Sequence, residues 1–130
     1  MRSTVLMALA VGPLVLLAAP PDKPLSPVEA RKQVGKKITV EMVVRASKNR
    51  LEKRKEIYLD SEANFRDEKN FAVVINAAGA AKFKAADIEE AASHFKGKTI
   101  RATGTVVVVQ GVPRIVVSDP KQVRVVSRKD

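Results

Sequence analysis

Apolar side chains fall on every second position in three stretches of the chain, residues 37–45, 56–60 and 71–75. This alternation is typical of strands that bury one face, so it predicts three strands in the first part of the chain. The second of these strands presents Tyr58 on its opposite face. The residues expected to face the core are Ile38, Val40, Met42, Val44, Ile57, Leu59, Phe71, Val73 and Ile75.

A helical spacing of apolar residues follows, from residue 79 to 95, and Gly97 is expected to end this helix. A long strand is then predicted over residues 99–109, with Val108 among the side chains facing the core and Gly104 marking a bend or bulge. The helix positions expected to be buried are Phe83, Ile88, Ala91, Ala92 and Phe95.

The end of the chain contains the closing strand. A turn is predicted at residues 110–113, after which Ile115 and Val117 continue to point inward. The dipeptide Asp119-Pro120 interrupts this strand before residues 123–126 resume the pairing. The predicted order is therefore three strands, a helix and two strands.

This order is the topology of the OB-fold, an all-β five-stranded Greek-key barrel with one helix between strands three and four. The sequences GKTIRATGTV (97–106) and QGVPRIVVSDPKQVRVV (110–126) resemble the closing half of small exported bacterial OB-fold proteins. VEMVVRASKN (40–49) and residues 57–75 resemble their upstream strands. Members of that group often carry names that describe nucleic-acid-binding or DNA-binding proteins, so the resemblance implies a binding function at the level of the fold.

The N-terminal segment has the layout of a secretory signal, because Arg2 precedes an apolar run that ends near residue 19. Pro20 and Pro21 follow at once and would hinder cleavage, so residues 1–19 are expected to be either a signal peptide or an uncleaved N-terminal anchor. Residues 20–27 are predicted to be a proline-rich tether and residues 28–130 the OB-fold domain. We expect an exported protein, periplasmic or secreted.

Composition narrows the chemistry further. The chain contains no cysteine, which excludes disulfides, thiolate metal ligands and a cysteine nucleophile. The single histidine, His94, falls near the predicted helix end, where a structural role is expected, and no serine has an evident base beside it. We therefore expect no catalytic residues and no enzyme.

Acidic residues between the second and third strands are the densest source of oxygen ligands, but their spacing matches no calcium-binding loop and they alternate with cations. No metal site and no cofactor is expected. A calcium-dependent nuclease-like enzyme, as some relatives of the barrel are, stays open as a third alternative. The acidic residues are Asp60, Glu62, Asp67 and Glu68, and the nuclease candidates are Arg45, Asp60, Glu62 and Arg66.

The formal net charge of +10 favours anionic polymers, although the same charge would also serve solubility. OB barrels bind ligands across strands two and three, between the loops that join strands one to two and four to five. The basic segment 47–55, SKNRLEKRK, is predicted to be the first of these loops, where cations would neutralise phosphates while Tyr58 and Phe65 stack on bases. The candidate binding residues are Lys48, Arg50, Lys53, Arg54, Lys55, Tyr58, Phe65 and Arg114.

These residues predict a non-catalytic module that binds an anionic polymer, with single-stranded nucleic acid as the first choice. With one or two aromatic platforms, binding is expected to be weak and sequence-tolerant. The alternative is an exported module that uses the same face for a protein or cell-envelope partner, and segment 47–55 would then be a solvated loop. The sequence indicates no small-molecule substrate, and it leaves the natural ligand and the oligomeric state open.

Overall fold

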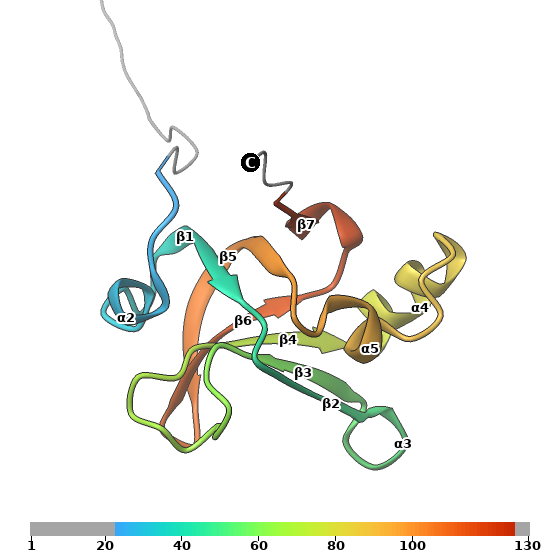
Figure 1. The fold of residues 1–130 in the computed structure, drawn as a ribbon, viewed down its shortest axis with the longest axis horizontal. Helices are drawn as coiled ribbons and strands as arrows, with labels where there is room; N and C mark the ends of the chain where they lie inside the picture. The colour runs from blue at the N-terminus through green and yellow to red at the C-terminus, as the bar shows by residue number, and fades with distance from the viewer. Residues whose placement is uncertain (1–22, 127–130) are drawn as a thin grey trace, which may run out of the picture.

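The computed structural model describes residues 23–126, so the expected signal segment lies outside the described residues. Seven strands in this part of the chain form one curled sheet around an apolar core (Figure 1). The helices lie at the margins of the sheet, with α4 and α5 together at one end (Figure 1). Between residues 23 and 126, no helix has the length and apolar character needed to cross a membrane.

The order of the strands in the sheet is β1-β5-β6-β4-β3-β2, and β7 pairs with β5. All neighbours are antiparallel except β4 and β6, which are parallel. Only residues 44 and 45 separate β1 from β2 in the chain, so the two ends of this path come from one continuous segment and the sheet curls around its core. The strands are β1 (Lys37–Val43), β2 (Ala46–Arg50), β3 (Glu56–Asp60), β4 (Ala72–Asn76), β5 (Thr99–Val109), β6 (Val112–Val117) and β7 (Val123–Val125).

The alternation in the sequence identified the core correctly in the first three predicted strands. Each side chain expected to face inward there is buried, as are Ile115 and Val117 in β6. The prediction for Val108 was wrong, because this side chain is 48% exposed. Val106 is the last buried residue of β5, and beyond it the strand continues into a hairpin with β6 that extends past the core.

The structure has more strands than the five predicted, first because a separate strand, β2, follows β1 in the chain. Residues 46–50 form β2 and pair in register with β3, although the segment was predicted to be a loop. All five side chains of β2 are exposed or half-buried, so the strand has no apolar alternation to reveal it. Its stability comes from backbone pairing, which sequence periodicity does not report. The short β7 accounts for the remaining difference.

The single helix predicted between the third and fourth strands is two helices. The chain breaks between them at Asp87, whose φ of 70° is left-handed and incompatible with a continuous helix. Ile88 therefore lies in the connection, partly buried against the core. Phe83 and Phe95, one from each helix, meet edge to face with ring centroids 5.5 Å apart and close this end of the core. The helices are α2 (Pro27–Ala30), α3 (Leu51–Arg54), α4 (Ala77–Ala85) and α5 (Ala91–Phe95).

The start of the described chain is also tied to the sheet. Ser26 forms a capping box with Glu29 at the start of α2. Leu25, which falls in the predicted tether, donates its backbone N–H to the Thr39 carbonyl at 2.8 Å and packs against the core. The residues immediately before α2 therefore belong to the folded domain.

Gly104 lies where the sheet curls, in keeping with the predicted bend, but no bulge forms there. The pairing of β5 passes from β1 to β6 just after this residue, with no interruption of the register. A Cβ atom at Gly104 would lie 2.6 Å from Cγ2 of Ile115, so the glycine permits the two strands to approach closely where the sheet curls.

Candidate functional site

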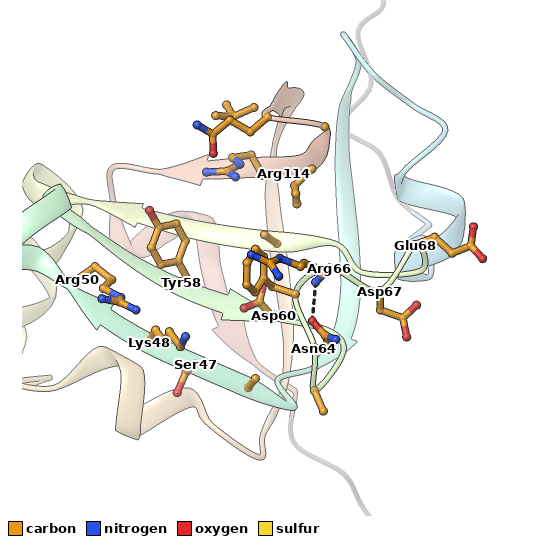
Figure 2. A pocket seen from close by; sticks show the side chains of 18 of the residues that line it. Ser47, Lys48, Arg50, Tyr58, Asp60, Asn64, Arg66, Asp67, Glu68 and Arg114 are labelled. Carbon is orange, nitrogen blue, oxygen red and sulfur yellow. Dashed lines mark hydrogen bonds between the residues drawn. The ribbon is translucent and has the colours of Figure 1, made fainter.

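A groove of about 1010 Å³ lies on the outer face of the sheet, over β2, β3, β4 and β6 (Figure 2). Residues 63–68 of the loop between β3 and β4 form one side, and residues 109–112 of the β5–β6 hairpin form the other. Ala46 and Ala72 lie along its floor, and their small side chains leave room above the backbone.

The lining of the groove carries more positive than negative charge. Six of its residues are Lys or Arg and three are Asp or Glu. Neither salt bridge found within residues 23–126 involves these cations, since one joins Lys82 to Asp119 and the other Arg101 to Glu41. Unneutralised cations around a concave surface concentrate the positive potential inside it and attract anions. The cations are Arg31, Lys48, Arg50, Arg54, Arg66 and Arg114, and the acids are Asp60, Asp67 and Glu68.

The structure brings six of the eight predicted binding residues to this groove. They come from five separate segments: β2, the α3 turn, β3, the loop after β3, and β6. Lys53 and Lys55 do not line it, because Lys53 faces a small hollow beside α3 and Lys55 is the left-handed residue that ends α3. The six are Lys48, Arg50, Arg54, Tyr58, Phe65 and Arg114.

Strand geometry explains why Lys48 and Arg50 enter the groove together. Both lie on β2 rather than on the predicted loop, two residues apart and hence on the same face. Lys48 is paired in register with Tyr58 of β3, so the cation and the aromatic ring lie on neighbouring strands. Figure 2 shows both residues on the groove side of their strands.

Arg114 occupies the middle of β6 and is only 9% exposed. Its register neighbours are Ala72 on β4 and Val107 on β5, neither of which has a side-chain acceptor. The buried Nε atom has no hydrogen-bond partner among the described residues. Its guanidinium carbon lies 6.0 Å from the centre of the Tyr58 ring, and Figure 2 shows both side chains over the groove.

Asp60 lies at the other side of the groove floor and is 7% exposed. Its Oδ1 accepts a hydrogen bond from Nδ2 of Asn70 at 3.0 Å, which fixes the carboxyl group. Burial raises the pKa of Asp60, against the opposing effects of the Asn70 hydrogen bond and the positive charges of Arg114 and Lys48. From the sequence, Asp60 was a candidate only as a metal or nuclease ligand, although its position two residues from Tyr58 predicts that both lie on the same face of the strand.

The loop between β3 and β4 is held by a buried asparagine, Asn70, which was not among the predicted site residues. The side-chain Oδ1 of Asn70 accepts a hydrogen bond from the backbone N–H of Glu62 at 3.0 Å. Its backbone carbonyl accepts one from Nη1 of Arg31 at 2.5 Å. This anchoring presents Phe65 and Arg66 at the rim of the groove, with the guanidinium 5.2 Å from the ring centre. Arg31 had no sequence signal, because it reaches the groove from α2 through tertiary packing.

The structure places only some of the residues considered for a metal ion or nuclease chemistry in the groove. Asp60 and Arg66 line the groove, whereas Arg45 and Glu62 do not. Within residues 23–126, no three His, Cys, Asp or Glu side chains gather in a group that would hold a metal ion. His94 lies in α5 beside the Phe95 ring, and burial, reinforced by Lys98, lowers its pKa.

No protein-family model matches the chain, and no curated protein matches it either. Several solved structures match the chain. An OBody, AM1L10, bound to hen egg-white lysozyme is 12% identical with a TM-score of 0.55, and the match covers 85% of this chain and all of that one. The chain adopts an OB-fold.

Two of the other similar structures are aminoacyl-tRNA synthetases. Asparaginyl-tRNA synthetase from Pyrococcus horikoshii has a TM-score of 0.53 at 17% identity, over 80% of this chain and 23% of that one. A putative aspartyl-tRNA synthetase from Leishmania major Friedlin has a TM-score of 0.52 at 13% identity, over 91% and 23%. The chain thus spans under a quarter of each synthetase. These matches confirm the predicted fold, with more strands and helices than expected.

Proposed function

We propose that this OB-fold is a non-catalytic module that binds an anionic polymer in the groove over β2, β3, β4 and β6, and that the polymer is single-stranded nucleic acid. The observation that carries the proposal is Arg114, a buried guanidinium with an unpartnered Nε at the centre of a groove that already carries excess positive charge. Leaving such a group unpaired costs about 1 to 3 kcal/mol, which a ligand with an acceptor would recover.

The other cations provide contacts for a phosphate backbone. Lys48 and Arg50 on β2 and Arg54 on α3 follow one another along one side of the groove. They are exposed, so they are free to approach phosphates with little desolvation cost. Binding through them would be insensitive to sequence and would weaken as salt increases.

Tyr58 and Phe65 provide surfaces on which bases can stack. Tyr58 is half-buried on β3 and Phe65 is 46% exposed on the loop. Each base stacked on an aromatic side chain contributes about 1 to 3 kcal/mol, so two platforms predict weak binding. The likeness to tRNA synthetases supports a nucleic-acid ligand at the level of the fold alone.

The proposal also retains an exported location and membership of the small exported bacterial OB-fold proteins, on the resemblance and the N-terminal sequence. Fractionation of cells that express the full chain, followed by N-terminal sequencing, would test the location. A chain found only in the cytoplasm with residues 1–19 intact would contradict it.

The binding proposal is tested by fluorescence-anisotropy titration of the full chain with a labelled single-stranded oligonucleotide at several salt concentrations. We expect a dissociation constant in the micromolar range, on the order that one or two stacked bases and a few phosphate contacts support. In the variant Lys48→Ala/Arg50→Ala/Arg54→Ala, the salt slope should become shallower by about 2, because each phosphate contact on a single strand contributes about 0.7.

A matched control removes the same charge elsewhere. Lys84, Lys96 and Lys98 are exposed and lie outside the groove, so their replacement by alanine should leave the slope nearly unchanged. Equal losses in both triple variants would show that net charge, and not the groove, drives binding. Absence of binding at low salt would contradict the nucleic-acid proposal and favour a protein or envelope partner, and calcium-dependent cleavage of the oligonucleotide would favour the nuclease.

A further inference from the structure

Asp60 and Arg114 lie at the two ends of one row of side chains across the sheet. Asp60 pairs in register with Ala72, and Ala72 pairs in register with Arg114. Residues in register point to the same face, and neighbouring strands lie about 4.8 Å apart, so the two charged residues face the groove from strands about 10 Å apart. The methyl group of Ala72 is the only side chain of the row between them.

The two charged groups do not neutralise each other. No salt bridge joins them in the described part of the chain, and none of the hydrogen bonds found there involves the Arg114 side chain. The carboxyl group of Asp60 is instead held by Asn70. A buried acceptor, held by Asn70, and a buried donor without a partner therefore face the same space above Ala72.

A planar ligand edge that satisfies both groups must offer donors to Asp60 and acceptors to Arg114. An ionised carboxylate only accepts hydrogen bonds and a guanidinium only donates them. Guanine presents two adjacent donors, N1–H and N2–H, and beside them two acceptors, O6 and N7. Adenine and cytosine offer a single donor group on the corresponding edge, and thymine and uracil place acceptors on both sides of their one donor. Of these bases, guanine alone offers two donors to Asp60 and two acceptors to Arg114.

We propose that the space above Ala72 is a guanine subsite, in which the Asp60 carboxylate accepts from N1–H and N2–H while the Arg114 guanidinium donates to O6 and N7. Tyr58, on the strand that carries Asp60, lies beside Arg114 and provides the surface against which the base stacks. This inference rests on the proposed function, and it adds a preference at one nucleotide position to binding that is otherwise sequence-tolerant.

The test uses the full chain and four labelled oligothymidines of equal length, each with one central position occupied by dG, dA, dC or dT. A bidentate contact discriminates between bases by about tenfold, so the dG oligonucleotide should bind about tenfold more tightly than the all-dT one. In Asp60→Asn the dG preference should fall to near unity, since the amide offers a donor where guanine also donates. Asp87→Asn, an exposed residue outside the groove, is the control and should keep the preference.

Two further measurements keep the test independent of the folding of Asp60→Asn. Ala72→Val fills the floor without a change of charge and should reduce the preference in the same way. Competition of the unaltered chain by the four free nucleoside monophosphates should rank guanosine monophosphate first, and competition by it as strong as that of the oligonucleotide would identify a mononucleotide as the ligand.

The outcomes separate this inference from the proposed function. Salt-dependent binding with equal affinity for all four oligonucleotides would overturn the guanine subsite and leave the groove as a sequence-tolerant site. Absence of binding to every oligonucleotide and every monophosphate would overturn both.

Discussion

Two arginines on the outer face of the sheet, Arg101 and Arg114, show how differently one fold can treat the same side chain. Arg101 of β5 lies opposite Glu41 of β1 in the register, and its Nε donates to the carboxylate at 2.7 Å. Arg114 of β6 lies between Ala72 and Val107, which have no acceptors to offer. One arginine is satisfied by its own chain, whereas the other is not.

The surroundings of these residues repeat the contrast. On the wall formed by β1, β5 and β7, the hydroxyls of Thr39 and Thr103 bond each other at 2.7 Å, and Gln122 donates to the Thr103 carbonyl. These polar groups on that wall are satisfied by neighbouring residues of the chain itself. The groove wall has cations that form no salt bridge within residues 23–126, and Ala72 lies where a partner for Arg114 would be. A binding surface of this kind is recognised by what the chain leaves unsatisfied.

Replacement of each arginine by methionine tests whether the two walls differ in their contribution to binding and to stability. We expect Arg114→Met to weaken oligonucleotide binding by about 2 kcal/mol or more, close to thirtyfold, because a central buried arginine is typical of a binding hot spot. Its stability should be unchanged or higher, since an unpartnered buried polar group is removed. Arg101→Met should keep the affinity and lose about 0.2 to 1 kcal/mol of stability with its ion pair.

Binding by anisotropy and unfolding by urea would measure both variants. If Arg114→Met keeps the affinity, or if Arg101→Met loses as much of it, the distinction between a paired wall and a binding wall is wrong. A marked loss of stability in Arg114→Met would show that the guanidinium serves the fold instead.

A smaller effect is expected at Tyr58, which tests whether the groove wall binds through an aromatic surface as well as through charge. Tyr58→Leu should weaken binding by about 1 kcal/mol, near fivefold, because the base loses its stacking platform. Tyr58→Phe keeps the ring and removes only the hydroxyl that donates to Oε1 of Glu56, so its affinity should match the unaltered chain. Equal weakening in both variants, measured in the same titration, would assign the effect to the hydroxyl.

The elements of the fold also differ in how well the sequence predicted them. Strands with one buried face were found from apolar alternation, as in β1, β3 and β6. The strand β2 was missed because all its side chains are exposed or half-buried, so its backbone pairing with β3 leaves no apolar alternation in the sequence. The helix break at Asp87 was missed because a left-handed residue has no apolar signature.

The site was predictable where a residue is charged or aromatic and close to an expected loop, as with Lys48, Arg54 and Tyr58. It was not predictable where it depends on neighbours from distant strands. The lack of a partner for Arg114 becomes visible only once Ala72 and Val107 are placed beside it. The anchoring of the loop by Asn70 depends in the same way on contacts that cross the fold.

The smallest expected effect concerns two aspartates with opposite pKa shifts. Burial raises the pKa of Asp60 in the groove, whereas a backbone hydrogen bond from Lys121 lowers the pKa of Asp119, which caps the turn before β7. A raised pKa means that the folded state binds the proton more tightly than the unfolded state. The ionised form of Asp60 therefore reduces stability above its folded pKa, and this penalty is relieved as the pH falls through that value towards the ordinary range.

Asp60→Asn removes the titration, so its stability relative to the unaltered chain should be highest near neutral pH and should decline as the pH is lowered through the raised pKa. Asp119→Asn should behave in the opposite sense. The stabilising effect of ionised Asp119 is present above its ordinary pKa and is lost as the pH falls below it towards the lowered folded value, so the deficit of the variant should shrink only in acid. Urea unfolding from neutral pH to about pH 3, on either side of the ordinary aspartate pKa, measures both differences. The same sign in both variants would contradict the view that the groove keeps a carboxylate poorly compensated, because Asp60 would then be stabilised by its surroundings as Asp119 is.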